Sequence, residues 1–348
     1  MTIILTKPPK TIALSRRKFL QGIAITAMAS PNSWAQNVSR SEWRKQREKT
    51  LEAMQQVMGR LPNFPRKMNR VWLLENQNSA ALIRLRINYQ SEPGDNVPAY
   101  LLIPRERHRP LPAMLCLHQT TKIGKAEPAG LGGIRNLQYA EELAKNGYVC
   151  LVPDYPYLGE NQFNPYAHGY VSCTMKGIVN HIRAVDILQA MAIVDPRRIG
   201  VIGHSLGGHN ALFVAAFDPR IKAVVTSCGF TKFSKYYNGN LKGWAGERYM
   251  PLIEKIYHND PAQMPFDFPD ILRAIAPRAL FINAPLHDAN FDNSGVRDCV
   301  ESALPVYEKV FQAQEKLIAQ YPNCGHDFPA SIREEAYKFL DKYLQNES

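Results

Sequence analysis

The feature that most constrains the fold of this chain is a glycine-flanked serine, Ser205, in the pentapeptide Gly203–Gly207. The apolar run Ile199–Ile202 precedes the pentapeptide, and a helix-like stretch, Gly208–Phe217, follows it. A serine on a tight turn from a strand to a helix adopts a strained backbone conformation that exposes its hydroxyl, and flanking glycines avoid collisions across the turn. The N-terminus of the following helix presents amides and a positive dipole to an anion beside the serine. The sequence therefore predicts a nucleophilic serine at a strand-to-helix elbow.

The rest of the chain alternates between strand-like and helix-like segments. A helix is expected at 39–58, and three strands at 71–74, 81–89 and 97–103, with a hairpin turn at 92–95. Beyond residue 110, near-continuous apolar strands are expected at 113–117, 148–153, 199–202, 221–227, 279–283 and 316–320, and helices at 134–146, 172–193 and 332–344. Antiparallel strands followed by this alternation predict an α/β fold, with a mostly parallel central sheet flanked by helices.

An acid and a base that can serve Ser205 follow it in the chain, in the order serine, acid, histidine. His326 stands between the last expected strand and the last expected helix, where a neutral imidazole can accept the serine proton and return it to a leaving group. Asp288 follows the strand 279–283 and is favoured as the carboxylate that orients this imidazole. Asp292 lies close enough in the sequence to remain an alternative acid.

Four further segments give the chain a resemblance to a known family. They are Leu-His-Gln-Thr at 117–120, Val-Pro-Asp at 152–154, Ala-Pro-Leu-His-Asp at 284–288 and Asn-Cys-Gly-His-Asp-Phe-Pro at 323–329. With the serine pentapeptide they make residues 70–345 similar to the α/β-hydrolases, and within that fold to the dienelactone-hydrolase and acetyl-xylan-esterase type. The resemblance implies a triad of Ser205, Asp288 and His326.

The resemblance also implies an oxyanion hole made of two backbone amides. One amide belongs to Leu206, the residue after the nucleophile, and the other to a loop that in many family members carries His-Gly. This chain has His118-Gln119-Thr120 there. The amide of Thr120 is favoured because it lies two residues after the histidine, and the amide of Gln119 is the alternative. His118 and His204 are expected to fix the loop and to pack in the core, respectively.

An aromatic-rich stretch lies at about 229–277, between two expected strands, where an α/β-hydrolase carries a lid or a wall of the substrate pocket. Aromatic rings there can stack on sugar or aryl groups, and they can equally form the core of the insertion itself. Tyr237 and Trp244 are the candidate rings for substrate binding. Arg248 is a candidate partner for a substrate carboxylate, with exposure to solvent as its alternative role.

The first 35 residues have the features of a targeting segment. Residues 15–20 form a twin-arginine motif, residues 22–29 are moderately apolar, and Ser33-Trp34-Ala35 offers small residues for cleavage before Gln36. This order predicts a twin-arginine signal peptide at 1–35 and a periplasmic or secreted protein. A helical segment at 36–70 and a hydrolase domain at 71–348 are expected to follow.

The composition is that of a folded enzyme. Of the 348 residues, 45% are hydrophobic and 21% charged, which excludes a disordered chain, and no stretch after the N-terminus is apolar for long enough to span a bilayer. Residues 1–35 hold five basic and no acidic residues, so 37 basic residues face 31 acidic ones in the remainder. These charges are dispersed and do not indicate nucleic-acid binding. The six cysteines lack metal-ligand spacing, and neither a metal nor a cofactor is expected.

The sequence therefore predicts a serine carboxylic ester hydrolase that acts through an acyl-enzyme on small-molecule or carbohydrate esters, with short-acyl esters such as acetylated carbohydrates preferred. A dienelactone hydrolase proper typically uses a cysteine nucleophile, which the serine at 205 argues against. A prolyl-oligopeptidase-like peptidase is one alternative, although such enzymes carry a large N-terminal propeller and fewer than 100 residues precede the hydrolase region. A non-catalytic binding protein is the other, although it would need a broken triad, and all three positions are filled.

Overall fold

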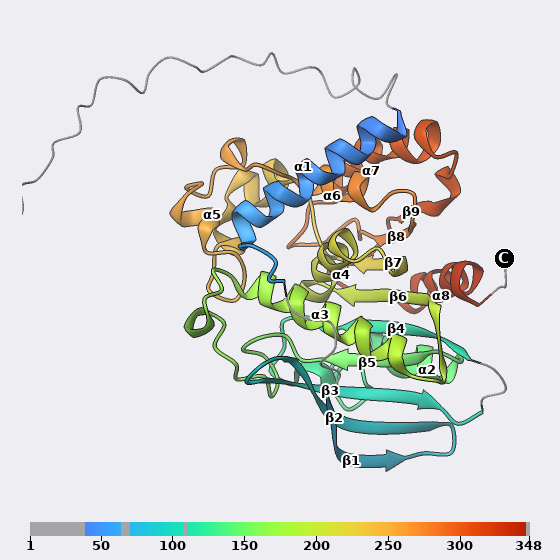
Figure 1. The fold of residues 1–348 in the computed structure, drawn as a ribbon. Helices are drawn as coiled ribbons and strands as arrows, with labels where there is room; N and C mark the ends of the chain where they lie inside the picture. The colour runs from blue at the N-terminus through green and yellow to red at the C-terminus, as the bar shows by residue number, and fades with distance from the viewer. Residues whose placement is uncertain (1–38, 64–69, 107–109, 346–348) are drawn as a thin grey trace, which may run out of the picture.

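The computed structural model describes residues 39–63, 70–106 and 110–345, and it contains a nine-stranded sheet with helices on both faces (Figure 1). The strands are β1 (Val71–Asn78), β2 (Leu82–Glu92), β3 (Asp95–Pro104), β4 (Leu111–Leu117), β5 (Val149–Pro153), β6 (Val194–His204), β7 (Ile221–Ser227), β8 (Ala279–Asn283) and β9 (Leu317–Gln320). The α-helices are α1 (Arg40–Met58), α2 (Tyr139–Lys145), α3 (Cys173–Ala190), α4 (Leu206–Phe217), α5 (Leu252–Lys255), α6 (Phe268–Ile275), α7 (Asn293–Pro305) and α8 (Ala330–Leu344). The predicted α/β class is confirmed, and the predicted signal peptide at 1–35 lies outside the described residues.

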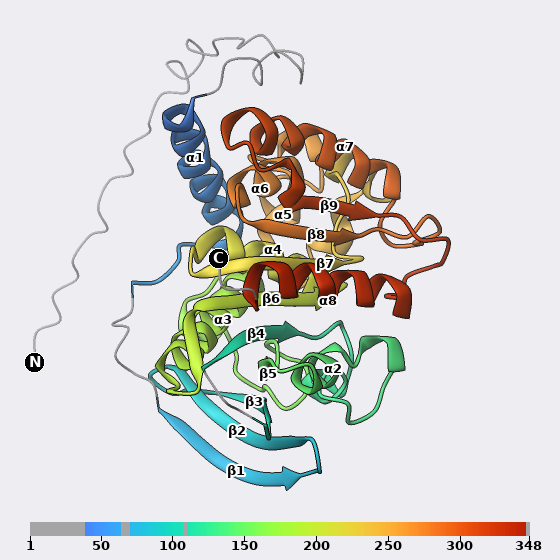
Figure 2. The same ribbon diagram turned by 90° about the vertical axis from the view of Figure 1, so that its right-hand side faces the viewer.

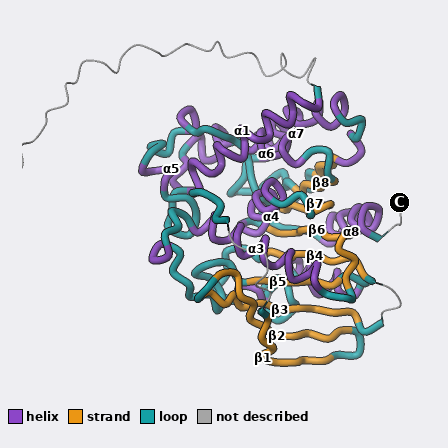
Figure 3. Tube along the Cα trace, in the orientation of Figure 1, coloured by secondary structure: helices purple, strands orange, loops and turns teal. Residues whose placement is uncertain are grey.

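The strands follow the order β1-β2-β3-β5-β4-β6-β7-β8-β9 across the sheet. The first three pair antiparallel, and β3 also runs antiparallel to β5. From β5 to β9 every neighbouring pair is parallel. Because parallel strands end at the same edge of a sheet, the segments that follow β4, β6, β7, β8 and β9 meet there, among the loops on the left of Figure 3.

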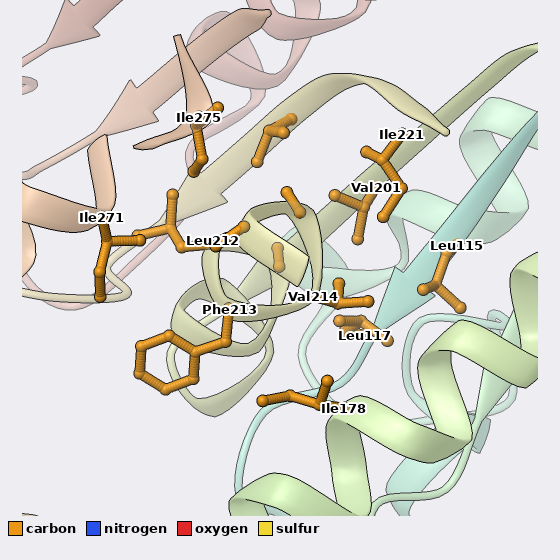
Figure 4. Close-up of a cluster of buried hydrophobic side chains, with 14 of the residues drawn as sticks. Leu115, Leu117, Ile178, Val201, Leu212, Phe213, Val214, Ile221, Ile271 and Ile275 are labelled. Carbon is orange, nitrogen blue, oxygen red and sulfur yellow. The ribbon is translucent and has the colours of Figure 1, made fainter. Parts of the chain in front are cut away.

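The strands bury side chains on both faces, which explains why the parallel ones read as continuous apolar runs. On β4, Leu115 and Leu117 point into a core shared with α3, α4 and α6, part of which Figure 4 shows. Met114 and Cys116 point the other way, into a core closed by α2 and α8 (Figure 2). Helix α1 packs against α6, and its Trp43 indole donates a 2.8 Å hydrogen bond to the carbonyl of Arg273.

Several predicted elements differ from the observed ones. The strands predicted at 221–227 and 279–283 coincide with β7 and β8, but the helix predicted at 134–146 is interrupted. A 3₁₀ turn at Arg135–Leu137 precedes α2, because Gln138 between them adopts φ −85° and ψ 35°. Helix α7 was not predicted, although Val296, Cys299 and Ala303 recur at helical spacing and are buried.

The stretch between β7 and β8 consists of short turns followed by one regular helix. It contains 3₁₀ turns at Phe233–Gly239, Leu241–Trp244 and Pro261–Gln263, the single-turn helix α5, and then α6. Helix α6 buries Ile271 and Ile275 in the core that also contains α4, and it therefore flanks the sheet. The part of this stretch that stands over the end of the sheet is Gly229–Phe266, named here the β7–β8 insertion.

Candidate active site

Ser205 lies between β6 and α4 with the strained backbone angles φ 54° and ψ −116°. Its amide donates a 2.8 Å hydrogen bond to the carbonyl of Ser227 at the end of β7. The two flanking glycines are required by close backbone contacts. A Cβ on Gly207 would lie 1.9 Å from the carbonyl oxygen of Leu117, and one on Gly203 would lie 2.2 Å from the carbonyl oxygen of Gly207. Tight packing on all sides holds the serine in a conformation that it would not adopt alone.

Asp288 and His326 form a hydrogen-bonded pair in the loops that follow β8 and β9. Nδ1 of His326 lies 2.9 Å from each carboxylate oxygen of Asp288. The aspartate is buried, and its Oδ1 also accepts the amides of Asn290 at 2.8 Å and Phe291 at 3.2 Å. Burial alone would raise the pKa of Asp288, but the hydrogen bond and charge of His326 and these two amides hold it below its usual value. The carboxylate is thus ionised and fixed beneath the imidazole.

Asp292, the alternative acid, has a different environment. It is the N-cap of α7, where its Oδ1 accepts the amide of Ser294 at 2.7 Å. Its carbonyl accepts a 2.7 Å hydrogen bond from the hydroxyl of Thr231. The structure therefore pairs Asp288 with His326 and uses Asp292 to begin a helix.

A pocket of about 300 Å³ opens beside Ser205 and His326. Its wall combines the two groups expected to carry the chemistry, the oxyanion-hole candidates and a set of aromatic and polar side chains: Gln119, Thr120, Ser205, Leu206, His209, Tyr236, Gly243, Trp244, Tyr249, Asn290, Phe291 and His326. All three predicted oxyanion-hole residues line this pocket. Leu206 is the first residue of α4, so its amide has no partner within the helix and is free to meet an anion.

The loop after β4 is held by a buried histidine of defined tautomer. Nε2 of His118 accepts the amide of Tyr155 at 3.0 Å, so the ring proton is on Nδ1, which donates to the carbonyl of Gln119 at 2.6 Å. Burial lowers the pKa of His118 and keeps it neutral. The side chain of Gln119 donates to the buried Glu127 at 3.0 Å. His118 thus holds the carbonyl of Gln119, Glu127 holds its side chain, and together they anchor the loop.

His204 packs edge-on against His326, with ring centroids 4.7 Å apart. Burial, aided by the proximity of His326, lowers the pKa of His204 to about 3. Its Nδ1 lies 2.9 Å from the hydroxyl of Ser227. His204 is consequently a neutral packing partner of His326 at any pH at which an imidazole base works.

Asn283, which the sequence analysis did not single out, supports the histidine loop. This buried side chain at the end of β8 donates to the hydroxyl of Ser227 at 2.8 Å and to the carbonyl of Asp327 at 2.9 Å. It joins the ends of two strands to the residue directly after His326. The sequence offers one signal for this role: Asn283 is a polar residue at the end of an otherwise apolar strand.

The three candidate substrate-binding residues have different positions. Trp244 lines the pocket, but it is almost fully buried among Phe233, Phe268 and other aromatic side chains of the core. Tyr237 and Arg248 are not among the described residues that line the pocket. Tyr237 is exposed, and its hydroxyl donates to Asn290 at 3.1 Å. Tyr236 and Tyr249, two other aromatic residues of the insertion, contribute to the pocket wall instead.

One cluster of metal-ligating residue types lies next to the site. Ligand atoms of His204, Cys228 and His326 lie within 4.8 Å of one another. However, Nδ1 of His326 is engaged by Asp288, and burial raises the pKa of the Cys228 thiol, which disfavours the thiolate that binds metals. The three side chains are therefore better explained by packing around His326 than by coordination of a metal ion.

A family described as the alpha/beta hydrolase fold matches residues 127–254. The sheet, the elbow and the order of Ser205, Asp288 and His326 agree with that match. The chain has the α/β-hydrolase fold.

Two proteins from other organisms are similar in sequence to this chain. The Bacillus subtilis protein YtaP is 28% identical over 262 residues, covering 72% of this chain and 84% of that protein. The 4-O-methyl-glucuronoyl methylesterase of Podospora anserina is 23% identical over 200 residues, which cover 53% of this chain and 41% of that protein. This chain therefore matches less than half of the length of the methylesterase.

Solved structures show the same fold at lower identity. A glucuronoyl esterase from Solibacter usitatus superposes with a TM-score of 0.68 at 18% identity, covering 87% of this chain and 94% of that one. Acetyl xylan esterase 1 from Thermoanaerobacterium superposes with a TM-score of 0.57 at 16% identity, covering 88% and 95%. Among the described helices of this protein, none combines the length and the apolar character that crossing a membrane requires.

Proposed function

We propose that this protein is a carboxylic ester hydrolase with Ser205 as its nucleophile, His326 as its general base and acid, and Asp288 as the group that orients the histidine. The observation that carries the proposal is the doubly hydrogen-bonded Asp288–His326 pair at 2.9 Å, whose imidazole shares a pocket wall with a serine in an elbow conformation. Such a pair fixes the tautomer in which Nε2 of the imidazole is free to accept a proton.

The reaction proceeds in two halves. Oγ of Ser205 attacks the acyl carbon while its proton passes to Nε2 of His326, and the carbon–oxygen bond to the alcohol then breaks as His326 protonates the departing oxygen. In the second half, water attacks the acyl-enzyme and gives a proton to His326. The ester bond to Ser205 breaks, the acid leaves, and the serine oxygen recovers its proton. Ionised Asp288 stabilises the imidazolium in both halves.

The oxyanion formed in each half is stabilised by two backbone amides. The amide of Leu206 is available at the start of α4, where the helix dipole adds positive potential. The second amide comes from the loop anchored by His118 and Glu127, with Thr120 as the proposed donor and Gln119 as the alternative. Thr120 is further tied to the insertion by a 3.2 Å hydrogen bond between its hydroxyl and that of Tyr249.

We further propose short-acyl esters on carbohydrates, such as acetylated sugars, as the substrates. The pocket of about 300 Å³ is at the small end of the range for ligand sites, which favours a short acyl group. Its aromatic walls, from Tyr236, Trp244 and Tyr249, suit the apolar face of a sugar ring. Similarity to an acetyl xylan esterase and to glucuronoyl esterases supports a carbohydrate ester as the substrate class.

The mechanism is tested by replacing Ser205 with alanine. Hydrolysis of p-nitrophenyl acetate should fall to background in a protein that melts cooperatively, and a fluorophosphonate probe should no longer label it. Ser234→Ala, an exposed serine in the insertion, is the matched control and should keep full activity and labelling. Turnover retained by folded Ser205→Ala would refute the serine mechanism.

The substrate proposal needs a separate panel. Acetylated xylo-oligosaccharides, methyl esters of glucuronic acid and an anilide should be compared on one preparation by kcat/KM. The acetylated sugars are expected to be turned over fastest and the anilide not at all. Faster cleavage of the methyl ester would overturn the acetyl preference while leaving the ester hydrolase intact, whereas anilide cleavage would favour a peptidase.

We also propose export by the twin-arginine route, which is supported by the motif at 15–20 and the small residues before Gln36. Expression in a bacterial host with and without twin-arginine transport should give periplasmic protein only in the former. Replacing Arg16 and Arg17 with lysine should retain the protein in the cytoplasm. Periplasmic protein that begins at Gln36 would identify the cleavage site.

A further inference from the structure

Strand β1 lies at an edge of the sheet and carries four consecutive exposed apolar side chains. Val71, Trp72, Leu73 and Leu74 each expose between 40% and 60% of their surface. Within the described residues β1 pairs with β2 on one side, and its other side faces outward. Figure 2 shows β1 at the lower margin of the sheet, away from the helices that cover the parallel strands.

Such an edge is unusual for a chain that stays monomeric. The outer side of an edge strand presents unpaired amides and carbonyls, and natural proteins usually protect it with charged side chains or proline. Here the first four residues of the edge strand are all large and apolar, and its second half is polar. Successive strand residues point to opposite faces, so these side chains line both faces of the edge. Exposed apolar side chains grouped in this way mark an interaction site.

The charges that flank the apolar residues indicate the partner. Arg70 precedes them and Glu75 follows them, and both are exposed. Two copies related by a two-fold axis pair their edge strands antiparallel. In that arrangement the end that carries Arg70 meets the end of the other copy that carries Glu75, and this occurs twice. The segment Arg70–Glu75 is therefore complementary to a second copy of itself.

We propose that β1 pairs with β1 of a second copy of this chain, so that the two nine-stranded sheets continue into one another across a two-fold axis. The occupant of this edge is thus another molecule of the same protein. Strands β2, β3, β5 and β4 separate β1 from β6, which leads to Ser205. The dimer leaves the pocket open and does not depend on the proposed ester hydrolysis.

Sedimentation velocity of the full chain over a range of concentrations tests the proposal. The expected species has twice the 39.4 kDa mass of one chain. Leu73→Lys, at the most exposed of the four positions, should raise the dimer dissociation constant by about a hundredfold, because the substitution enters a two-fold interface twice. Leu304→Lys is the matched control: this leucine is 38% exposed on α7, away from the edge, and the dimer should persist.

A charge exchange tests the pairing itself. Arg70→Glu and Glu75→Lys should each weaken the dimer by placing like charges together, and the double variant should restore it. Thermal unfolding of each variant at low concentration checks that the monomer fold is intact. A monomeric wild-type chain, a dimer unaffected by Leu73→Lys, or a double variant weaker than both single variants would overturn the proposal. Binding of a monomer to lipid vesicles through this edge would also overturn it.

Discussion

The elbow around Ser205 and the β7–β8 insertion enclose the same pocket, but they are built in opposite ways. At the elbow, backbone meets backbone so closely that Gly203 and Gly207 cannot carry a side chain. In the insertion, short turns and several residues with positive φ, among them Tyr237, Asn238, His258 and Asn259, are held by packed aromatic rings. The pocket thus has one side formed by a tightly packed backbone and another side formed by the side chains of the insertion.

Two carboxylates near these regions differ in a similar way: Asp288 lies in the loop after β8, and Asp267 directly follows the insertion. Asp288 is held below its usual pKa by His326 and by two backbone amides. Asp267, the N-cap of α6, lacks a cationic partner of that kind, and burial raises its pKa to about 6. The same type of side chain is therefore kept ionised where it is hydrogen-bonded to His326 and is made easier to protonate where it caps a helix.

The largest expected effect comes from Asp288→Asn. An amide in place of the carboxylate no longer fixes the tautomer of His326 or stabilises its cation, so kcat should fall by about 10³- to 10⁴-fold. Asp292→Asn serves as the control, because asparagine is also a good N-cap and α7 should be retained. Equal losses from both variants would show that the acid has been misassigned.

The next largest effect is expected from the aromatic packing of the insertion. Trp244→Ala removes a buried ring that contacts Phe233, Phe268 and Phe291, and it should lower the free energy of unfolding by about 3–5 kcal/mol. Tyr237→Ala, at an exposed ring, should change it by less than about 0.5 kcal/mol. Urea denaturation measures both, and similar values would contradict the assignment of Trp244 to the core.

The same small substitution should have different outcomes in the two regions. Gly207→Ala places a Cβ against the carbonyl of Leu117 and should cost about 3 kcal/mol of stability together with most of the activity. Gly246→Ala in the insertion meets nothing closer than a ring carbon of Tyr249 at 3.6 Å and should be tolerated. Thermal unfolding and esterase assays of the pair distinguish the rigid region from the permissive one.

The smallest effect is a pH dependence that originates in Asp267. Because its pKa rises from 3.8 to about 6 on folding, the folded state holds this proton more tightly than the unfolded state does. Its stabilising contribution is complete below about pH 4 and is lost as the pH rises through 6, a change on the order of 2–3 kcal/mol.

Asp267→Asn removes this titration, so its melting temperature should fall less than that of the wild type between pH 4 and pH 7. Asp260→Asn, at the exposed cap of the turn Pro261–Gln263, should leave the wild-type slope in place. Identical slopes for wild type and Asp267→Asn would show that Asp267 does not titrate in this range.

Local sequence signals predicted the parts of this molecule that depend on neighbouring residues. Strands β7 and β8 have the predicted bounds because a buried parallel strand requires a continuous apolar run. The elbow was recognisable because Gly203 and Gly207 flank Ser205 between an apolar run and a helix-like stretch. The contact that requires Gly207, with the carbonyl of Leu117 on β4, is visible only in the structure. Helix α7 and the interruption at Gln138, within the helix predicted at 134–146, were not predicted, since packing rather than propensity decides them.

Local sequence signals could not decide whether Asp288 or Asp292 pairs with His326. Both residues lie in the same short loop after β8, and either spacing is compatible with a triad. Only the folded loop shows that one carboxylate turns toward His326 and the other toward the amide of Ser294. The assignment of Trp244 to the core and of Tyr249 to the pocket wall depended on the structure for the same reason.

The sequence by itself determined an α/β sheet and a serine at a strand-to-helix turn, because apolar periodicity and a glycine-flanked serine are patterns of neighbouring residues. The tertiary structure decided which carboxylate meets His326, which aromatic rings line the pocket and which strand leaves an apolar edge exposed. Those outcomes depend on segments far apart in the chain that meet at the ends and edges of one sheet. A pattern of neighbouring residues does not indicate which distant segments of the chain will come into contact.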